Sequence, residues 1–336
     1  MGTDQVKDAR KLKVLDKIQS TMAPDIEAMN GIIRSLLHTD HSLVNSIIDN
    51  YLLTKGKQIR PILVMLAARM FGDINDDVLH AAAAIEMLHN ATLIHDDVVD
   101  QTPLRRGNAT INAVWGNHLA VLSGDIFVSK ALEAGIKTGN QKILKSLSDL
   151  GTELSLGEMD QLFNARRHNL NEEAYFSMIE RKTASLFVGC VRIGALAVGA
   201  GEEQFRGLVE YAACLGRAFQ IRDDIFDYFP SDDVGKPTGH DLLEGKVTLP
   251  ILVALGNAPV EEADKMRQIL LEGDELKPDE IRKLHDFAKA YRGIEAAYAK
   301  MQSLREEGMA IIKEYPDSES KKYFAEIFDY IIERKY

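Results

Sequence analysis

In LIHDDVVDQTPLRRG, residues 93–107, an apolar helical run ends in three aspartates, and two arginines follow them. On a helix, residues three and four apart share a face, so Asp96 and Asp97 both lie beside Asp100. Carboxylates at this spacing repel one another, which predicts that positive charge is bound among them. The end of a helix also disfavours carboxylates electrostatically, so a solvated helix end explains this triplet poorly.

Helical spacing of apolar residues continues over almost the whole chain of 336 residues. Strand-like alternation is almost absent, and most of the nine prolines lie at expected helix ends. No linker rich in Ser, Gly or Pro divides the chain, so we predict one all-α domain, 1–336, of ten or more helices. The expected helices are 8–30, 41–54, 61–71, 76–100, 109–137, 141–165, 171–199, 203–229, 240–256, 262–273, 279–291, 294–314 and 318–334.

Composition limits the compartment and the partners. The net charge is -11 and there is no long basic run, which argues against a nucleic-acid binder. Cys190 and Cys214 lie in apolar surroundings, as expected of buried thiols in a reducing compartment. The first residues lack the apolar core of a signal peptide, and the apolar stretch 186–201 contains Arg192 and is short for a membrane span. We expect a cytoplasmic protein without a transmembrane segment.

The pattern of the opening stretch occurs again in QIRDDIFDYFPSDDVGKP, residues 220–237. Asp223, Asp224 and Asp227 end an apolar helical run, and Lys236 follows in a loop. Magnesium prefers oxygen ligands and is often completed by substrate phosphates. Two such triplets that face each other could hold several Mg²⁺ ions around a diphosphate.

Cations elsewhere in the chain fit the same chemistry. GKQIRP places Lys57 and Arg60 just before Pro61, which is favoured at the first position of a helix, where anions bind readily. A plain surface-charge role for this pair stays open. His89 lies seven residues before Asp96 on nearly the same helical face, and a satisfied core histidine is the alternative there.

Further residues could contact phosphate groups, since arginine pairs with such oxygens through two hydrogen bonds. No nucleophile elbow, P-loop or Rossmann fingerprint occurs, so the chemistry indicated is electrostatic stabilisation of a diphosphate leaving group. The additional candidates are Arg105, Arg106, Lys182, Thr183, Lys236 and Lys246.

Taken together, HDDVVD with LRRG, GKQIRP, KTASLF, FQIRDDIFD and GKPTGHDLLEGKVTLP resemble the motifs of the trans-isoprenyl diphosphate synthases, also called polyprenyl synthetases. The resemblance covers about residues 50–250 in the family's order. It implies the isoprenoid synthase fold, with mostly antiparallel helices around a central cavity, a homodimer and Mg²⁺ dependence. It also implies a prenyltransferase that condenses isopentenyl diphosphate head to tail (1'-4) with an allylic diphosphate, expected to be farnesyl diphosphate.

The resemblance assigns roles residue by residue. The metal ligands would be Asp96, Asp97, Asp100, Asp223, Asp224 and Asp227, the last acting more through indirect contacts. Isopentenyl diphosphate would be bound by Lys57, Arg60, His89 and Arg106. The allylic diphosphate would be bound by Arg105, Lys182, Gln220, Lys236 and Lys246. Thr183 would lie near the reacting carbons, so the catalytic set is Lys182 and Thr183 with the aspartates other than Asp227.

Product length should depend on the helix that carries the first motif. Ile85, Leu88 and Thr92 form a stripe that leads to Asp96, and Ile85 lies about 16 Å from Asp96 along the axis. Short-chain members of the family have bulky aromatics just before the first aspartate, where this chain has the small Ala91 and Thr92. By that analogy we predict a long-chain product of about C30–C50, a quinone side-chain precursor. Ordinary helix packing is the alternative.

Other functions remain open. A class I terpene cyclase also uses DDxxD and Mg²⁺, but it typically has an Asn/Ser/Glu second motif and needs no second diphosphate site. A catalytically silent subunit would usually lack some aspartates, whereas an active large subunit of a heteromeric synthase would keep all six. Asp125, Glu158 and Gln161 are polar residues in helices expected to be buried, where either structural hydrogen bonds or substrate contacts are possible.

Overall fold

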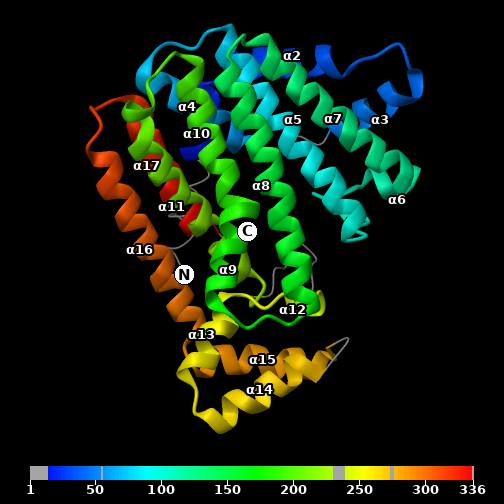
Figure 1. Cartoon of the computed structure of the whole chain (residues 1–336), viewed down its shortest axis with the longest axis vertical. Helices are drawn as coiled ribbons and strands as arrows, with labels where there is room; N and C mark the ends of the chain where they lie inside the picture. The colour runs from blue at the N-terminus through cyan, green and yellow to red at the C-terminus, as the bar shows by residue number, and fades with distance from the viewer. Residues whose placement is uncertain (1–13, 54–55, 230–238, 273–275, 335–336) are drawn as a thin grey trace. The chain divides into compact units, whose positions relative to one another are not determined.

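The computed structural model describes residues 14–53, 56–229, 239–272 and 276–334, and this part of the chain is almost entirely helical (Figure 1). The all-α prediction is therefore confirmed. Residues 14–21 are helical. The elements that follow are α2 (Ala23–Leu37), α3 (Ser42–Leu52), α4 (Ile59–Phe71), α5 (Asp76–Val99), β1 (Leu104–Arg105), β2 (Asn108–Ala109), α6 (Ile111–Trp115), α7 (Asn117–Lys137), α8 (Gln141–Arg166), α9 (Glu172–Ile179), the π-helix η1 (Glu180–Ala184), α10 (Ser185–Ala197), α11 (Glu202–Phe226), α12 (His240–Leu243), α13 (Leu249–Asn257), α14 (Val260–Glu272), α15 (Pro278–Ala290), α16 (Gly293–Lys313) and α17 (Glu319–Glu333).

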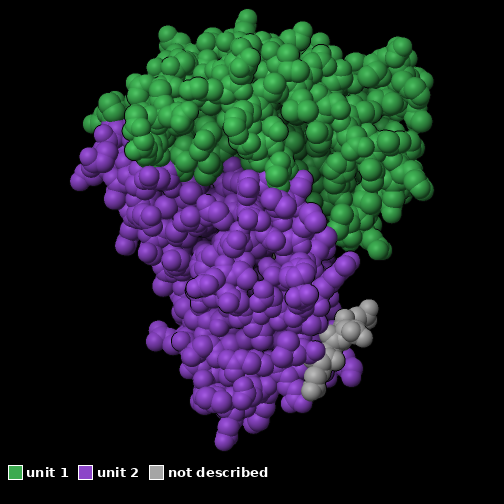
Figure 2. All heavy atoms as spheres, in the orientation of Figure 1, with its two compact units in different colours: residues 1–152, 186–209, 316–324 green, residues 153–185, 210–315, 325–336 purple. Residues whose placement is uncertain are grey.

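The chain divides into two compact units, coloured separately in Figure 2. Unit 1 comprises residues 1–152, 186–209 and 316–324, and unit 2 comprises residues 153–185, 210–315 and 325–336. Helices α8, α11 and α17 contribute residues to both units. The first aspartate motif belongs to unit 1 and the second to unit 2, while a single domain 1–336 stays a prediction.

Unit 1 is organised around α5, which packs against α2, α4 and α7. Its run of alanines, residues 81–84, is completely buried, since side chains this small let neighbouring helices approach closely. Gly124 of α7 extends this close packing, because a Cβ there would collide with the ring of His95 near the end of α5. The first aspartate motif thus extends from a tightly packed helix.

Unit 2 contains α13 packed against α15 and α16. Gly293, the first residue of α16, allows this approach because an added Cβ would collide with the carbonyl oxygen of Pro250. On another side, Tyr211 of α11 meets Phe328 of α17 edge to face, with ring centroids 5.6 Å apart. This ring contact packs the half of α11 that ends in the second motif against α17.

Several predicted helices are interrupted, and glycine explains two of the breaks. Gly116 (φ 84°) separates α6 from α7, and Gly245 (φ 74°) lies between α12 and α13, because both adopt a left-handed conformation. The sequence shows almost no strand-like alternation, and in the described part of the chain β1 and β2 make one short antiparallel hairpin. Arg106 (φ 53°) and Gly107 (φ 78°) form its turn, and two positive φ angles suit the twist of a two-residue hairpin loop.

Both cysteines, Cys190 and Cys214, are buried and free, as predicted. Burial raises the pKa of the Cys190 thiol to about 12 and that of the Cys214 thiol to about 11. Neither thiol is therefore reactive at neutral pH. Among the described helices, none combines the length and the apolar character that a membrane crossing requires.

Candidate active site

The first aspartate motif has a built-in counter-ion. Asp97 is 3% exposed, and its Oδ1 accepts a hydrogen bond from Arg105 Nε at 2.7 Å. The same oxygen forms an ion pair with a terminal nitrogen of Arg105, also at 2.7 Å. The hairpin that follows α5 brings Arg105 back to the helix end. Thr102 N–H donates to the carbonyl oxygen of Asp97 at 2.9 Å and so helps to fix the chain between α5 and the hairpin. Asp96 and Asp100, on either side, are partly exposed.

The hairpin turn directs the second arginine elsewhere. The guanidinium of Arg106 lies against Gly56, where a Cβ would collide with it. The two arginines predicted to bind separate phosphates therefore have separate surroundings. Arg105 lies beside the first aspartate motif, and Arg106 lies beside the loop that leads into α4.

The predicted isopentenyl diphosphate residues Arg60, His89 and Arg106 gather in unit 1. His89 is 7% exposed, and burial together with the charges of Arg60 and Arg106 holds its pKa well below the usual value. His89 is therefore a neutral imidazole that can donate one hydrogen bond. Burial raises the pKa of Glu86, although the same two arginines oppose this.

The loop before α4 carries Lys57 and is fixed by its neighbours. The carbonyl oxygen of Lys57 accepts a hydrogen bond from Gln19 Nε2 at 2.8 Å. Gln58 adopts a left-handed φ of 49°, and its amide exchanges hydrogen bonds with that of Asn30, the closer at 2.9 Å. Because α4 begins at Ile59, its N–H groups lie next to Lys57, an arrangement that suits an anion.

The predicted chain-length residues lie one to three turns before the first motif. Ile85 and Ala91 are 0% exposed and Leu88 is 6% exposed. Thr92 is partly exposed, and its hydroxyl donates to the carbonyl oxygen of His89 at 2.8 Å. The side chains at these positions are thus packed or internally bonded, and their effect on product length stays a prediction.

The second motif also has a buried middle aspartate, but its partners are neutral. Asp224 is 4% exposed and accepts hydrogen bonds from Tyr175 Oη at 2.6 Å and from Gln220 Nε2 at 2.9 Å. Burial raises the pKa of Asp224 to about 7, and the charges of Asp223 and Asp227 act in the same direction. The two hydrogen bonds oppose this rise without cancelling it.

The outer aspartates of this motif have different partners. The carboxylate of Asp227 accepts the backbone N–H groups of His240 at 2.9 Å and Asp241 at 3.3 Å, at the start of α12. This contact fits the indirect role expected for Asp227. Asp223 forms an ion pair with Arg334, which directly follows α17.

Lys182 and Thr183 lie in the π-helix η1. The hydroxyl of Thr183 donates to Gln220 Oε1 at 2.6 Å, so one chain of hydrogen bonds runs from Thr183 through Gln220 to Asp224. Single π-turns often occur at functional sites. This turn lies directly on α8, because a Cβ at Gly157 would collide with the backbone of Lys182.

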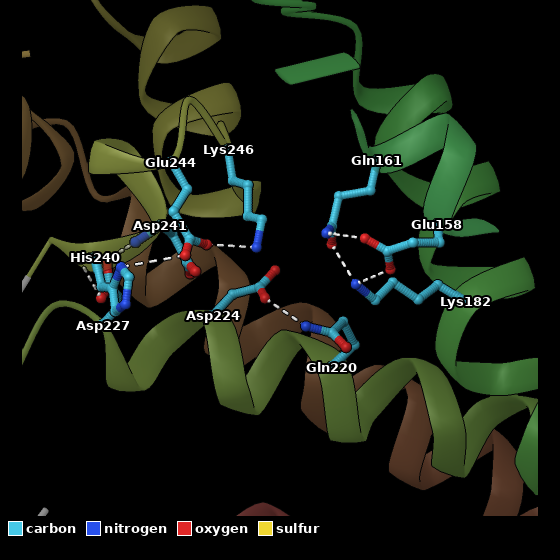
Figure 3. Close-up of polar contacts among 10 residues, drawn as sticks. All are labelled: Glu158, Gln161, Lys182, Gln220, Asp224, Asp227, His240, Asp241, Glu244 and Lys246. Atoms are coloured by element: carbon cyan, nitrogen blue, oxygen red, sulfur yellow. Dashed lines mark hydrogen bonds and ion pairs between the residues drawn. The ribbon is translucent and has the colours of Figure 1, made fainter. Parts of the chain in front are cut away.

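Glu158 and Gln161, whose roles the sequence left open, both contact Lys182. Its ammonium donates to Gln161 Oε1 at 3.0 Å and forms an ion pair with Glu158. Gln161 Nε2 in turn donates to Glu158 Oε1 at 3.1 Å, which closes a triangle (Figure 3). Asp125, the third such residue, lies 3.4 Å from His95 Nε2 and is largely exposed.

Unit 2 contains a cavity of about 190 Å³, and Tyr175, Gln220 and Asp224 are among the residues that line it. Figure 3 shows Lys246, Asp224 and Gln161 directed into the same space. Lys246 forms an ion pair with Glu244. The predicted residues that line the cavity are Gln161, Lys182, Gln220, Asp224 and Lys246, whereas Lys236 lies outside the described residues.

The donor set suits Mg²⁺ that is completed by phosphate. Within the described ranges, no three His, Cys, Asp or Glu side chains converge closely enough to hold a metal ion by themselves. The partly exposed Asp96, Asp100 and Asp223 offer carboxylate oxygens beside the buried aspartates. Magnesium typically binds through one or two carboxylates, waters and substrate oxygens, so such incomplete sites fit it.

Sequence reasoning missed four residues of these sites. Asp241 lies within the quoted GKPTGHDLLEGK and lines the cavity, and burial raises its pKa well above the usual value. Glu86 could have been noticed as an acid within an apolar run. Tyr175 and Arg334 carry no local signal, since they lie 49 and 111 residues from the aspartates they contact.

Comparison with known proteins gives consistent matches. Residues 41–287 match the family described as Polyprenyl synthetase. The octaprenyl diphosphate synthase of Escherichia coli (strain K12) is 38% identical over 261 residues, which are 77% of this chain and 81% of that protein.

Solved structures match over nearly the whole length. A decaprenyl diphosphate synthase from Rhodobacter capsulatus superposes with a TM-score of 0.89 at 31% identity, covering 96% of this chain and 99% of the other. A polyprenyl synthase from Caulobacter crescentus CB15, complexed with calcium and isoprenyl diphosphate, gives a TM-score of 0.88 at 29% identity and covers 96% and 98%.

Proposed function

This chain belongs to the polyprenyl synthetase family, and from that premise we propose how it works and what it makes. It is a prenyltransferase of the long-chain trans-polyprenyl diphosphate synthase type. Its substrates are isoprenoid diphosphates. We propose that isopentenyl diphosphate is added repeatedly to an allylic diphosphate primer, farnesyl diphosphate, and that the reaction depends on Mg²⁺.

One observation carries the proposal: Lys182, Gln220, Asp224 and Lys246 converge on a single cavity although they come from η1, α11 and the segment before α13. Two ammonium groups beside a carboxylate form a site for a diphosphate with its cations. Each lysine is paired with a glutamate, Lys182 with Glu158 and Lys246 with Glu244. These pairs hold the ammonium groups in place until a diphosphate competes for them.

In this mechanism the chain stabilises charge on the leaving group. Magnesium, for which the aspartates of each motif would supply ligands, would draw charge off the allylic diphosphate as its bond to carbon breaks. Lys182 and Lys246 neutralise the departing oxygens, and Thr183 and Gln220 hold Asp224 in register. Arg60, Arg106 and neutral His89 bind isopentenyl diphosphate, whose double bond attacks the allylic carbocation. The released diphosphate takes the proton, so the mechanism uses no protein base.

We further propose a product of about C30–C50 for a quinone side chain, because Ala91 and Thr92 are small. A cytoplasmic homodimer is supported by the two free thiols and by the exposed apolar side chains of α7. On that helix Leu122 is 56% and Ile136 is 63% exposed. Large apolar side chains exposed along one helix are often covered at an interface.

One alternative shares this surface. An active large subunit of a heteromeric synthase would cover the apolar face of α7 with a different chain. A class I terpene cyclase is disfavoured, because it would have no use for Arg60, His89 and Arg106 gathered as a second diphosphate site.

The test is to incubate the purified chain with Mg²⁺, labelled isopentenyl diphosphate and farnesyl diphosphate, and to size the products by chromatography. We expect products of about C30–C50, none with a chelator, and about 10²-fold slower turnover for Lys182→Ala. The matched control is Lys145→Ala, which removes an exposed lysine of α8 that pairs with Asp149 of that helix. No incorporation by a folded chain would refute the proposal, and activity that requires a second chain would favour the heteromer.

A further inference from the structure

Arg334, the residue that follows α17, is anchored on α11, the helix that carries the second motif. Arg222 of α11 donates from Nε to the carbonyl oxygen of Arg334 at 2.9 Å, and from a terminal nitrogen to Tyr298 Oη at 2.7 Å. Arg222 is 8% exposed. A buried arginine thus fixes the backbone at Arg334 independently of the Arg334 side chain.

The Arg334 side chain is itself packed. Its guanidinium lies over the ring of Phe219, 4.0 Å from the centroid, and donates to the carbonyl oxygen of Phe219 at 3.3 Å. The same terminal nitrogen forms the ion pair with Asp223 Oδ1. The side chain is 13% exposed, so solvent screens the pair less than it screens a surface pair. Stacking and two acceptors hold the guanidinium in one orientation.

From this geometry we propose that Arg334 is a positioning residue for the second motif, acting through Asp223. This inference rests on the proposed function. Asp223, Asp224 and Asp227 repel one another, and the Arg334 charge offsets the first of them before any metal arrives. A carboxylate has about four lone-pair sites, so it can accept from a guanidinium and bind a cation together.

Arg334 therefore acts on metal binding rather than on the reacting carbons. Partners that orient metal-binding carboxylates typically contribute 10–100-fold to metal affinity. Loss of the Arg334 side chain should allow Asp223 to rotate away from its neighbours. The expected effect is a higher Mg²⁺ requirement, with kcat at saturating Mg²⁺ changed little.

The variant Arg334→Ala removes the guanidinium but keeps the carbonyl oxygen that Arg222 holds. Its matched control is Arg305→Ala, which breaks another arginine–aspartate pair of unit 2, Arg305 with Asp329 at 2.6 Å. Arg334→Lys keeps the positive charge but not the planar guanidinium, and should restore part of the Mg²⁺ affinity that Arg334→Ala loses. The double variant with Asp223→Asn tests whether the two residues act together.

Calorimetry measures the Mg²⁺-dependent binding of an unreactive thiolo analogue of farnesyl diphosphate, and thermal unfolding without metal checks folding. For Arg334→Ala we expect the Mg²⁺ concentration at half-saturation to rise about tenfold or more, with no further rise in the Asp223→Asn background. An unchanged requirement in folded Arg334→Ala, a lowered one, or an equal rise in Arg305→Ala would overturn the inference. If the wild-type chain itself binds no analogue, the proposed function fails. If the wild type binds the analogue and Arg334→Ala has the same Mg²⁺ requirement, only the inference about Arg334 fails.

Discussion

The two aspartate motifs share a sequence pattern but differ in electrostatic surroundings. The middle aspartate is buried in both, with Asp97 3% and Asp224 4% exposed. Asp97 is met by the guanidinium of Arg105, whereas Asp224 accepts hydrogen bonds from the neutral Tyr175 and Gln220. Burial raises the pKa of Asp224 to about 7. Aspartates at identical spacing thus have different electrostatic surroundings in the two motifs.

The difference follows from where the partners come from. Arg105 lies only eight residues from Asp97, on a hairpin that the local sequence builds. Tyr175 and Arg334 lie 49 and 111 residues from the second motif, on other helices or beyond them. The first motif therefore has a local counter-ion, whereas the second depends on helix packing for its environment.

The largest expected effect tests whether both motifs share the work. Asp96→Ala and Asp223→Ala should each lower the turnover number by about 10²–10³-fold, because each removes a carboxylate proposed to hold cations on the leaving group. Steady-state assays at saturating Mg²⁺ measure this. Asp49→Ala, which breaks an exposed pair with His38, is the control. A variant that keeps full turnover would show that its motif is not needed for the reaction.

A smaller effect concerns stability in the first motif. Asp97→Asn should lower the free energy of unfolding by about 2 kcal/mol, because it leaves the partly buried Arg105 without its charge partner. Urea unfolding of the metal-free chain measures it. The control Asp125→Asn alters a largely exposed contact and should cost under about 0.5 kcal/mol. Equal losses of unfolding free energy in the two variants would show that the Asp97–Arg105 pair stabilises the fold no more than an exposed contact does.

In the second motif, replacing the buried aspartate by asparagine should raise the free energy of unfolding at pH 8 instead of lowering it. The pKa of Asp224 is raised to about 7 in the folded state from an ordinary value of 3.8, so the fold disfavours its ionised form. Without metal, the free energy of unfolding should therefore fall as pH rises from about 4 to about 7 and then level off. Asp224→Asn should flatten this profile and stabilise the chain at pH 8 by about 1 kcal/mol or more.

Thermal unfolding in chelator at pH 5 and pH 8 compares the wild type with Asp224→Asn. The variant Glu203→Gln, at the exposed start of α11, controls for loss of a negative charge on the same helix. An Asp224→Asn variant that is less stable than wild type at pH 8 would contradict the conclusion that the fold disfavours the ionised form of Asp224.

The smallest expected energetic effect concerns the residues that precede each motif on its helix. Ala91 and Thr92 stand five and four residues before Asp96, where α11 has Ala218 and Phe219 before Asp223. Ala91→Phe should shorten the product without abolishing turnover, because a large ring would block the growing chain. Product chromatography measures this, with Thr92→Val as a control of nearly unchanged volume. An unchanged product distribution in folded Ala91→Phe would refute the proposed tunnel.

Helices that follow one uninterrupted apolar pattern were predicted well. The helix expected at 76–100 is α5, Asp76–Val99, and the one expected at 294–314 is α16, Gly293–Lys313. Errors arose where a single residue overrides periodicity, as Gly116 does, or where tertiary contact reshapes a helix, as Gly157 does beneath η1. Pattern reasoning averages over several turns and cannot register such single contacts.

The amino-acid sequence by itself determined the helical class, both aspartate triplets and most of the cations proposed to bind phosphate, because a helix repeats its faces every few residues whatever surrounds it. Only the tertiary structure decided which charge or hydroxyl each buried aspartate meets. Arg334 reaches Asp223, and Tyr175 reaches Asp224, only after distant segments pack together. The electrostatic environment of a carboxylate depends on its neighbours within a few ångströms, and periodicity along the chain does not specify them.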